Sequence, residues 1–506
     1  MATFTTVSAT FNSVPAPKQQ TLTSNYIDFT ADGNGWAQQY LPDLMEKEAE
    51  VFGNRSVGGF LEMVGAEEAM TSDQVVWSEQ GRLHLSYKGN CARVGSTAVY
   101  NFSVIQDIDG NALTGASAAA AAANLAVRVG DLVIIADADA TVRGYVTAIV
   151  TPTQVSSSGV FLCDFTVAAL TDDGTGIGTV TRSNSDVTCT MMVFGSGFAK
   201  GTNGRAGQNQ PSFKSFTNRP IILKDKYAVS GSDASAIGWV EVSGEDGQAG
   251  YMWYLKAAGD TRQRFADYLE MSMIEGELVS TNAATVVDAD ANAFSGTEGL
   301  FAAITARGHL YDGLNSTSGT AAAEQLEDFD SILAKFDEQG AIEEYMLFLN
   351  RSVSLKIDDM LAGMNSYGAG GTSYGVFNNE EDMALNLGFS GFRRGSYDFY
   401  KTDWKYLNDK GTRGGLADVD NHVRGVFIPA GVTSVYDQNL GKNLKRPFLH
   451  VRYRASQMDD RRMKTWTTGS VGAETSDLDA MEMHFLSERC LVTQGANNFI
   501  LLKGTE

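Results

Sequence analysis

The residue types that most often do chemistry are scattered along this chain. Five histidines and four cysteines share no short spacing: His84, His309, His422, His450, His484, Cys91, Cys163, Cys189 and Cys490. Metal sites need ligands at characteristic spacings, such as paired cysteines or HExxH, and none occurs here. The cysteines are typical of reduced thiols in a cytosolic protein and predict no disulfide framework. We expect no metal ion and no cofactor.

Motifs for nucleophilic or phosphate chemistry are also missing. The chain has no Walker-A pattern, its GxSxG match at Gly371–Gly375 lies in a glycine-rich loop and not at a strand-to-helix elbow, and the glycine cluster at 174–179 lacks the strand-turn-helix context of a dinucleotide site. The acid pairs Glu343-Glu344 and Asp358-Asp359 could supply a general acid and base. However, adjacent residues on a helix point about 100° apart, which favours a solvated face over a catalytic pair. We expect no catalytic residues and no enzyme.

Composition limits the number of domains and the classes of protein that fit this chain. The chain has 506 residues, a hydrophobic fraction of 43% and a formal net charge of −22, so it can build a substantial core over about three domains. Strong acidity disfavours dedicated nucleic-acid binding. The N-terminus lacks the pattern of a signal peptide, and the most apolar run is too short to span a bilayer.

One stretch departs from this acidity. Residues 440–464 hold eight basic side chains against two aspartates: Lys442, Lys445, Arg446, Arg452, Arg454, Arg461, Arg462 and Lys464. Such a cluster could face nucleic acid, or it could face an acidic patch on another copy of the chain. The second interpretation is favoured because the chain is so acidic and because arginine is enriched at interfaces.

The first half of the chain is rich in strand-like runs. Residues 81–195 alternate β-rich segments with Gly, Asp and Ser clusters, which predicts a separate all-β domain. Residues 196–256 contain strand candidates at Ile221–Leu223 and Trp239–Val242. This predicted hairpin has too few apolar residues to fold alone, so we expect it to lean on another part of the protein or on a neighbouring subunit.

Helical patterns follow. Asp260 predicts the start of a helix, with Gln263 completing a capping box, and Phe265, Leu269 and Met273 form one apolar stripe along residues 260–278. Two further helices are predicted, one capped by Thr297 and closed by Gly308, the other over 324–340. A strand at 345–349 then leads to a helix capped by Asn350, and strands dominate the C-terminal region. A further short helix is predicted between Pro42 and Gly53.

This order of elements resembles the major capsid protein of tailed bacteriophages, the fold shared with herpesvirus shells, and within it the crAss-like phages. The resemblance implies an α+β fold with an N-arm, E-loop, spine helix, peripheral domain and axial domain, plus an inserted small all-β domain. The implied ranges are these: 1–80 N-terminal arm and start of the peripheral region, 81–195 inserted domain, 196–256 E-loop, 257–344 spine helix and peripheral domain, 345–470 axial domain, and 471–506 strands returning to the peripheral domain.

The resemblance also implies a function and partners. The chain would assemble with itself into hexamers and pentamers of an icosahedral shell in the host bacterial cytoplasm, and it would reside in the virion. Portal, scaffolding and decoration proteins are implied partners, and the shell would enclose double-stranded DNA without sequence-specific binding or membrane contact. No cross-linking chemistry is predicted. Ten residues are expected at subunit contacts: Lys224, Lys226, Arg262, Arg264, Lys445, Arg446, Arg452, Arg454, Arg461 and Arg462.

Two other classes remain open. Glycine-rich strands at 81–195 are compatible with a β-rich surface adhesin or another virion structural protein. The missing signal peptide and the absence of sandwich-like periodicity after residue 257 count against an adhesin. A carboxylate-based glycosidase is supported only by the number of acids and aromatic residues.

Overall fold

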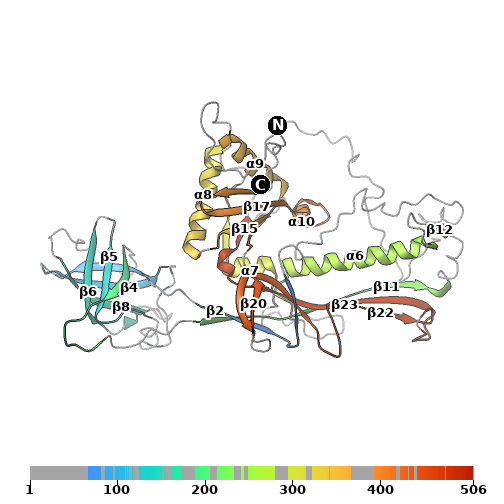
Figure 1. Ribbon diagram of the computed structural model, residues 1–506, viewed down its shortest axis with the longest axis horizontal. Helices are drawn as coiled ribbons and strands as arrows, with labels where there is room; N and C mark the ends of the chain where they lie inside the picture. Colours follow the sequence, from blue (N-terminus) through green and yellow to red (C-terminus); the bar gives the residue numbers. More distant parts are fainter. Residues whose placement is uncertain are drawn as a thin grey trace. The chain divides into compact units, whose positions relative to one another are not determined.

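The computed structural model (Figure 1) describes residues 66–504 with gaps. The gaps are 81–85, 95–96, 109, 111, 113–116, 118–124, 139, 151–152, 155–160, 172–187, 205–212, 233–240, 244–248, 280–294, 315–321, 341, 366–390, 417–421, 431, 438–441 and 473. The predicted helix between Pro42 and Gly53 lies outside the described residues. The chain divides into two compact units, one formed by Ser78–Ser215 and the other by the residues on either side of it.

The unit Ser78–Ser215 is built around a closed antiparallel barrel. Its strands are β3 (Ser86–Arg93), β4 (Val99–Asp107), β5 (Asp131–Ala136), β6 (Thr141–Ile149), β7 (Thr153–Gln154), β8 (Phe161–Ala169) and β9 (Cys189–Ser196). They follow the order β4-β3-β9-β5-β6-β8-β7, and β4 also pairs with β8, which closes the ring. Inward positions alternate with outward ones along β5 and β8, so side chains such as Phe102, Val133 and Phe165 form the core inside the ring. Closure leaves six of the strands paired on both sides.

The other unit contains two sheets. The five-stranded sheet consists of β1 (Ala66–Met70), β21 (Leu449–Arg454), β23 (Ala480–Thr493) and β11 (Ile221–Ser230) in that order, with β22 (Lys464–Gly469) also paired to β23. β11 runs antiparallel to β23 over its whole length, from Ile221 opposite Arg489 to Ser230 opposite Ala480. The expectation that Ile221–Leu223 leans on another part of the protein is confirmed, and that part is the C-terminal strand of the same chain. The predicted pairing of Ile221–Leu223 with Trp239–Val242 is wrong, because β11 belongs to the five-stranded sheet whereas Glu241–Ser243 pairs with Ala249–Tyr251.

The six-stranded sheet is mixed. Its order is β14 (His309–Tyr311), β24 (Ile500–Lys503), β18 (Val423–Pro429), β15 (Glu344–Leu349), β17 (Tyr397–Asp403) and β16 (Gly391–Arg394). Helices α8 (Ala322–Gln339) and α9 (Arg351–Asn365) share one hydrophobic core with it, and both lie beside β15 and β17 in Figure 1. β23 and β24 belong to different sheets.

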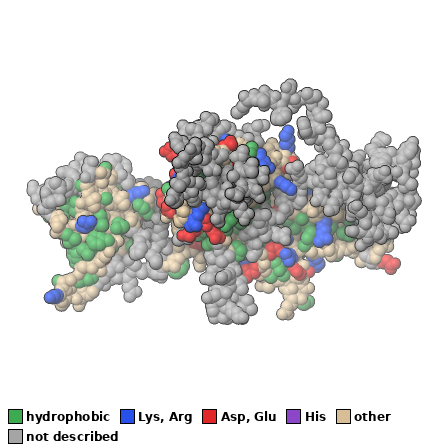
Figure 2. Space-filling view, turned by 45° about the horizontal axis from the view of Figure 1, so that its top comes forward, with side chains coloured by type: hydrophobic (Ala, Val, Ile, Leu, Met, Phe, Trp, Pro, Cys, Tyr) green, Lys and Arg blue, Asp and Glu red, His purple; other side chains and the backbone are tan. Residues whose placement is uncertain are grey.

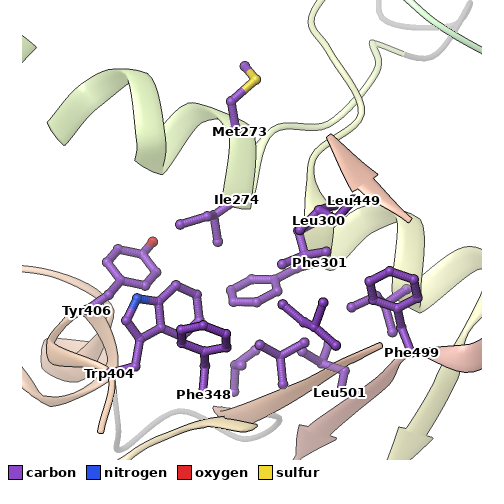
Figure 3. Close-up of a cluster of buried hydrophobic side chains, with 14 of the residues drawn as sticks. Met273, Ile274, Leu300, Phe301, Phe348, Trp404, Tyr406, Leu449, Phe499 and Leu501 are labelled. Atoms are coloured by element: carbon purple, nitrogen blue, oxygen red, sulfur yellow. The ribbon is translucent and has the colours of Figure 1, made fainter. Parts of the chain in front are cut away.

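A shared core joins the two sheets. Phe301 of α7 (Leu300–Arg307) packs against Trp404 with ring centroids 6.2 Å apart, and Trp404 also contacts Phe348. Leu449 from the five-stranded sheet and Leu501 from the six-stranded sheet belong to the same cluster (Figure 3). Burying each such aliphatic or aromatic side chain contributes about 1.5–3 kcal/mol.

Helix α6 (Met252–Glu275) begins earlier and ends earlier than predicted. The proposed N-cap, Asp260, lies inside the helix, so the capping interpretation is wrong. The helix instead starts directly after β13 (Ala249–Tyr251), which pairs with β12 (Glu241–Ser243) in a short hairpin. The apolar stripe is confirmed, because Phe265, Leu269 and Met273 are all buried.

The predicted caps of the next two helices are partly confirmed. Asn350 caps α9 as predicted, since its side-chain oxygen accepts a hydrogen bond from the Val353 backbone at 2.9 Å. Helix α7 ends before Gly308 as predicted, but its N-cap is Gly299 rather than Thr297. Thr297 is buried and hydrogen-bonds to Asn218.

Candidate subunit interface

Helix α6 lies along the five-stranded sheet and presents its opposite face outward (Figure 1). Its apolar stripe packs on β11 and β23, where the rings of Phe265 and Phe485 are 5.8 Å apart and Tyr227 and Val229 complete the cluster. Tyr268, one residue before Leu269, is 47% exposed. Arg262 and Gln263 are also exposed, so the described part of the helix has an apolar face on the sheet and exposed side chains away from it.

The basic residues predicted near this element behave differently from one another. Arg264 donates to Asp225 of β11 at 2.9 Å, and Lys226 pairs with Glu482 of β23 at 3.4 Å. Within the described part of the chain, Lys224 and Arg262 are exposed and have no ion-pair partner. Their role in subunit contacts stays a prediction.

The basic stretch at 440–464 is largely neutralised within its own chain. Its hairpin, β19 (Val432–Asp437) and β20 (Lys442–Pro447), carries Lys445 and Arg446, whose side chains lie outside the described residues. Arg452 pairs with Glu68 at 3.1 Å. Arg462 also pairs with an acid of the N-terminal region, Glu67. These acids lie on β1, far away in the sequence. On the face shown in Figure 2, basic and acidic side chains are interspersed.

We call the contacts between residues 66–73 and the C-terminal strands the β1 clasp. β1 pairs in parallel with β21, which places Glu68 beside Arg452 and Met70 beside Arg454. Arg454 also forms an ion pair with Asp73. Five paired backbone positions and several ion pairs therefore hold β1 at the edge of the five-stranded sheet.

Glu488 is the buried acid beneath the clasp. Its side chain is 5% exposed and accepts from both Arg454, at 3.2 Å, and Arg461. The neighbouring Arg489 is also buried. Burial lowers its pKa, while the Glu67 carboxylate opposes that shift. Arg489 donates to the Arg462 backbone oxygen at 2.8 Å. Glu67, Glu68, Asp73, Glu488 and Arg489 were not identified from the sequence, because no local pattern links acids and bases so far apart.

Strands β2 (Val75–Gln80) and β10 (Phe213–Asn218) form a two-stranded sheet. Trp77 of β2 and Phe216 of β10 belong to the unit that contains the two larger sheets. The Arg307 guanidinium lies 5.5 Å from the Trp77 ring and 4.6 Å from the Phe216 ring, and it pairs with Glu298 at 2.7 Å. Asn218 is 1% exposed and donates to the backbone oxygens of Glu298 and Leu491. These contacts therefore hold Trp77 of β2 and the C-terminal end of β10 against α7 and β23.

The structure also locates the groups considered for catalysis. Glu343 and Glu344 are exposed, as a solvated face requires. Asp358 is different, because it forms a largely buried ion pair with Lys401, so the solvated-face prediction is wrong for that residue. All four cysteines are free and buried. In the described ranges, no three or more His, Cys, Asp or Glu side chains gather where a metal ion could bind.

Among the residues the structure describes, no helix combines the length and apolar character needed to cross a bilayer.

Comparisons with known proteins place the chain beside phage structures. No protein-family model matches it, and no curated protein is significantly similar. A solved structure titled Microbacterium phage Oxtober96 covers 94% of this chain and 98% of its own at 8% identity, with a TM-score of 0.36. The capsid structure of the Cyanophage P-SCSP1u covers 61% and 79% at 10% identity, with a TM-score of 0.32. The mature capsid of bacteriophage PhiM1 covers 64% and 79% at 9% identity, with a TM-score of 0.31. At these TM-scores, any function must be argued from the chain's own geometry.

Proposed function

We propose that this chain is a structural, non-catalytic subunit of a phage capsid that assembles with itself into hexamers and pentamers of a closed shell. The observation that carries the proposal is the α6 layer. A 24-residue helix, about 36 Å long at 1.5 Å per residue, lies on long antiparallel strands and follows directly after a hairpin. Such a stiff layer with an unburied outer face suits a tile that meets its neighbours edge to edge.

In this proposal, β11, β23 and α6 form the peripheral region and its spine helix. The six-stranded sheet with α8 and α9 forms the axial region, and the hairpin β12–β13 forms the tip of the E-loop. The barrel of Ser78–Ser215 is the inserted domain. Charge supports the arrangement, because a net charge of −22 disfavours adhesion to enclosed DNA. Portal, scaffolding and decoration proteins would be the further partners.

The hairpin can be tested separately from the rest of the tile. Residues 233–248 lie between β11 and β13, so deleting them leaves every strand of the five-stranded sheet and all of α6 in place. We expect the deletion variant to remain folded, with an unchanged urea unfolding midpoint measured by circular dichroism, and to lose assembly into shells or rings. A folded variant that still assembles to the same size would refute the assignment of this hairpin as an intersubunit element.

A further inference from the structure

Two of the buried cysteines are neighbours inside the barrel. Cys91 of β3 is 0% exposed and Cys189 of β9 is 1% exposed, and both belong to the barrel core. β3 and β9 pair antiparallel, with Cys189 opposite Gly89. Cys91 is therefore the diagonal neighbour of Cys189 on the inward face. The backbone of β4 packs directly against Gly89, where an added Cβ would lie 1.9 Å from the Ser103 carbonyl oxygen.

We propose that Cys91 and Cys189 are a redox-active dithiol that closes into a disulfide between the first and last strands of the barrel. The inference stands on this unit alone and does not depend on the proposed function. The two residues are 98 positions apart in the sequence. The bond would join the strand by which the chain enters the barrel to the strand by which it leaves, with every other barrel strand inside the closed loop.

The local chemistry separates this pair from the other cysteines. A hydrogen bond from Cys91 lowers the pKa of Cys189 to about 7, against the opposing effect of burial, and the Thr188 hydroxyl lies 3.5 Å from the Cys189 sulfur. Burial raises the pKa of Cys163 and that of Cys490 to about 12. At neutral pH, Cys189 therefore has far more thiolate character than Cys163 or Cys490, and the thiolate is the reactive form.

Bond closure needs a small backbone adjustment. Diagonal neighbours have Cα atoms about 7–8 Å apart, whereas disulfides usually join Cα atoms about 4.4–6.8 Å apart. Cys189 is the first residue of β9, so the adjustment falls at a strand end. There, the Thr188 backbone donates to the Gly89 oxygen at 3.1 Å and holds the two strands together.

Peroxide is small enough to serve as the oxidant for buried thiols. The Cys189 thiolate attacks one peroxide oxygen, the O–O bond breaks, and a sulfenic acid and hydroxide form; the hydroxide then takes up a proton to become water. The Cys91 sulfur then attacks the Cys189 sulfur, the S–O bond breaks, and the departing oxygen leaves as a second water with the thiol proton. Two thiols are oxidised and one peroxide is reduced to two waters.

The test is to treat the full chain with hydrogen peroxide near pH 7, alkylate it in denaturant and measure its intact mass. We expect a loss of about 2 Da, two cysteines protected from alkylation and a cross-linked peptide containing Cys91 and Cys189. Cys163→Ala should retain the cross-link and Cys189→Ala should abolish it. Amide exchange in β3 and β9 should slow at least about tenfold on oxidation and recover with a reductant.

The intact-mass measurement on the unmodified chain does not depend on whether a variant folds. Alkylation of all four cysteines, a bridge that includes Cys163 or Cys490, or sulfinic acid at Cys189 without a bridge would each overturn the proposal.

Discussion

The Arg489 guanidinium lies 3.5 Å from a carboxylate oxygen of Glu67, across a separation of 422 residues. Arg489 is in the long C-terminal strand β23, and Glu67 is in the first described strand, β1. The contact shows that opposite ends of the described chain are joined in one sheet. The β1 clasp therefore joins the first described strand to the long C-terminal strand.

Removing the charge of Glu488 should destabilise the unit that contains it. Glu488→Gln leaves Arg454 and Arg461 facing a neutral group at a buried position, and because both arginines are partly exposed we expect a loss of about 1–3 kcal/mol. All six tryptophans belong to this unit, so urea unfolding followed by tryptophan fluorescence reports on it. The matched control is Glu338→Gln, whose partner Lys335 and own side chain are both more than half exposed. This control should change the unfolding free energy by less than about 1 kcal/mol. Equal effects of the two variants would contradict the buried role of Glu488.

High salt should weaken the ion pairs of the β1 clasp and speed amide exchange in β1, while exchange in the rest of the sheet stays the same. The Glu67–Arg462 and Asp73–Arg454 pairs each include a side chain more than half exposed, and 1 M salt shortens the Debye length to about 3 Å. Hydrogen exchange measured by mass spectrometry should show faster exchange for Ala66–Met70 at high salt. The backbone of Met481–Leu486 in β23, which is paired with both β11 and β22, should be unaffected. Salt-independent exchange in Ala66–Met70 would show that apolar packing of Met70, rather than charge, holds this strand.

The two faces of α6 should respond differently to truncation. Phe265→Ala removes a side chain that is 1% exposed and packed on Phe485, so we expect a loss of about 3–5 kcal/mol in the unfolding free energy. Tyr268→Ala changes an exposed position and should alter monomer stability by less than about 0.5 kcal/mol. The proposed subunit role adds that Tyr268→Ala should impair assembly measured by light scattering. Normal assembly of this variant would show that Tyr268, on the exposed face of α6, is not part of the subunit interface.

Alkaline pH should destabilise the unit that contains Tyr397. Burial, followed by a hydrogen bond to Asp337, raises the pKa of Tyr397 to about 12 from an ordinary value of 10. The neutral phenol is therefore favoured in the folded state, and its contribution to stability is complete below pH 10 and lost as the pH rises to about 12. One such group gives a slope of up to about 1.4 kcal/mol per pH unit. Urea unfolding of Tyr397→Phe should show a shallower decline between pH 10 and 12, and an unchanged slope would assign the effect to other groups.

Local signals in the sequence predicted local structure well. Asn350 was identified as a helix cap, and Phe265, Leu269 and Met273 were identified as one apolar stripe, and both predictions are confirmed. The start of α6 was missed because Asp260 is a favourable cap in isolation, whereas the helix continues back to Met252 next to the β12–β13 hairpin. A favourable cap residue does not prevent a helix from extending beyond it.

Long-range pairing could not be predicted in the same way. The basic stretch at 440–464 was recognised, but its partners Glu67 and Glu68 are nearly 400 residues away and carry no complementary local pattern. The same limit applies to Asp358, whose partner Lys401 comes from a neighbouring strand. Register between distant strands depends on the whole sheet, and a single sequence contains no direct record of it.

The most direct test of the proposed function is the size of the particles that the purified full-length chain forms, measured by light scattering together with negative-stain microscopy. The proposal predicts closed shells, or rings of five and six copies, with the Tyr268→Ala variant shifted toward smaller species under identical conditions. A chain that remains monomeric across salt and protein concentrations, with and without candidate scaffolding and portal proteins, would contradict it.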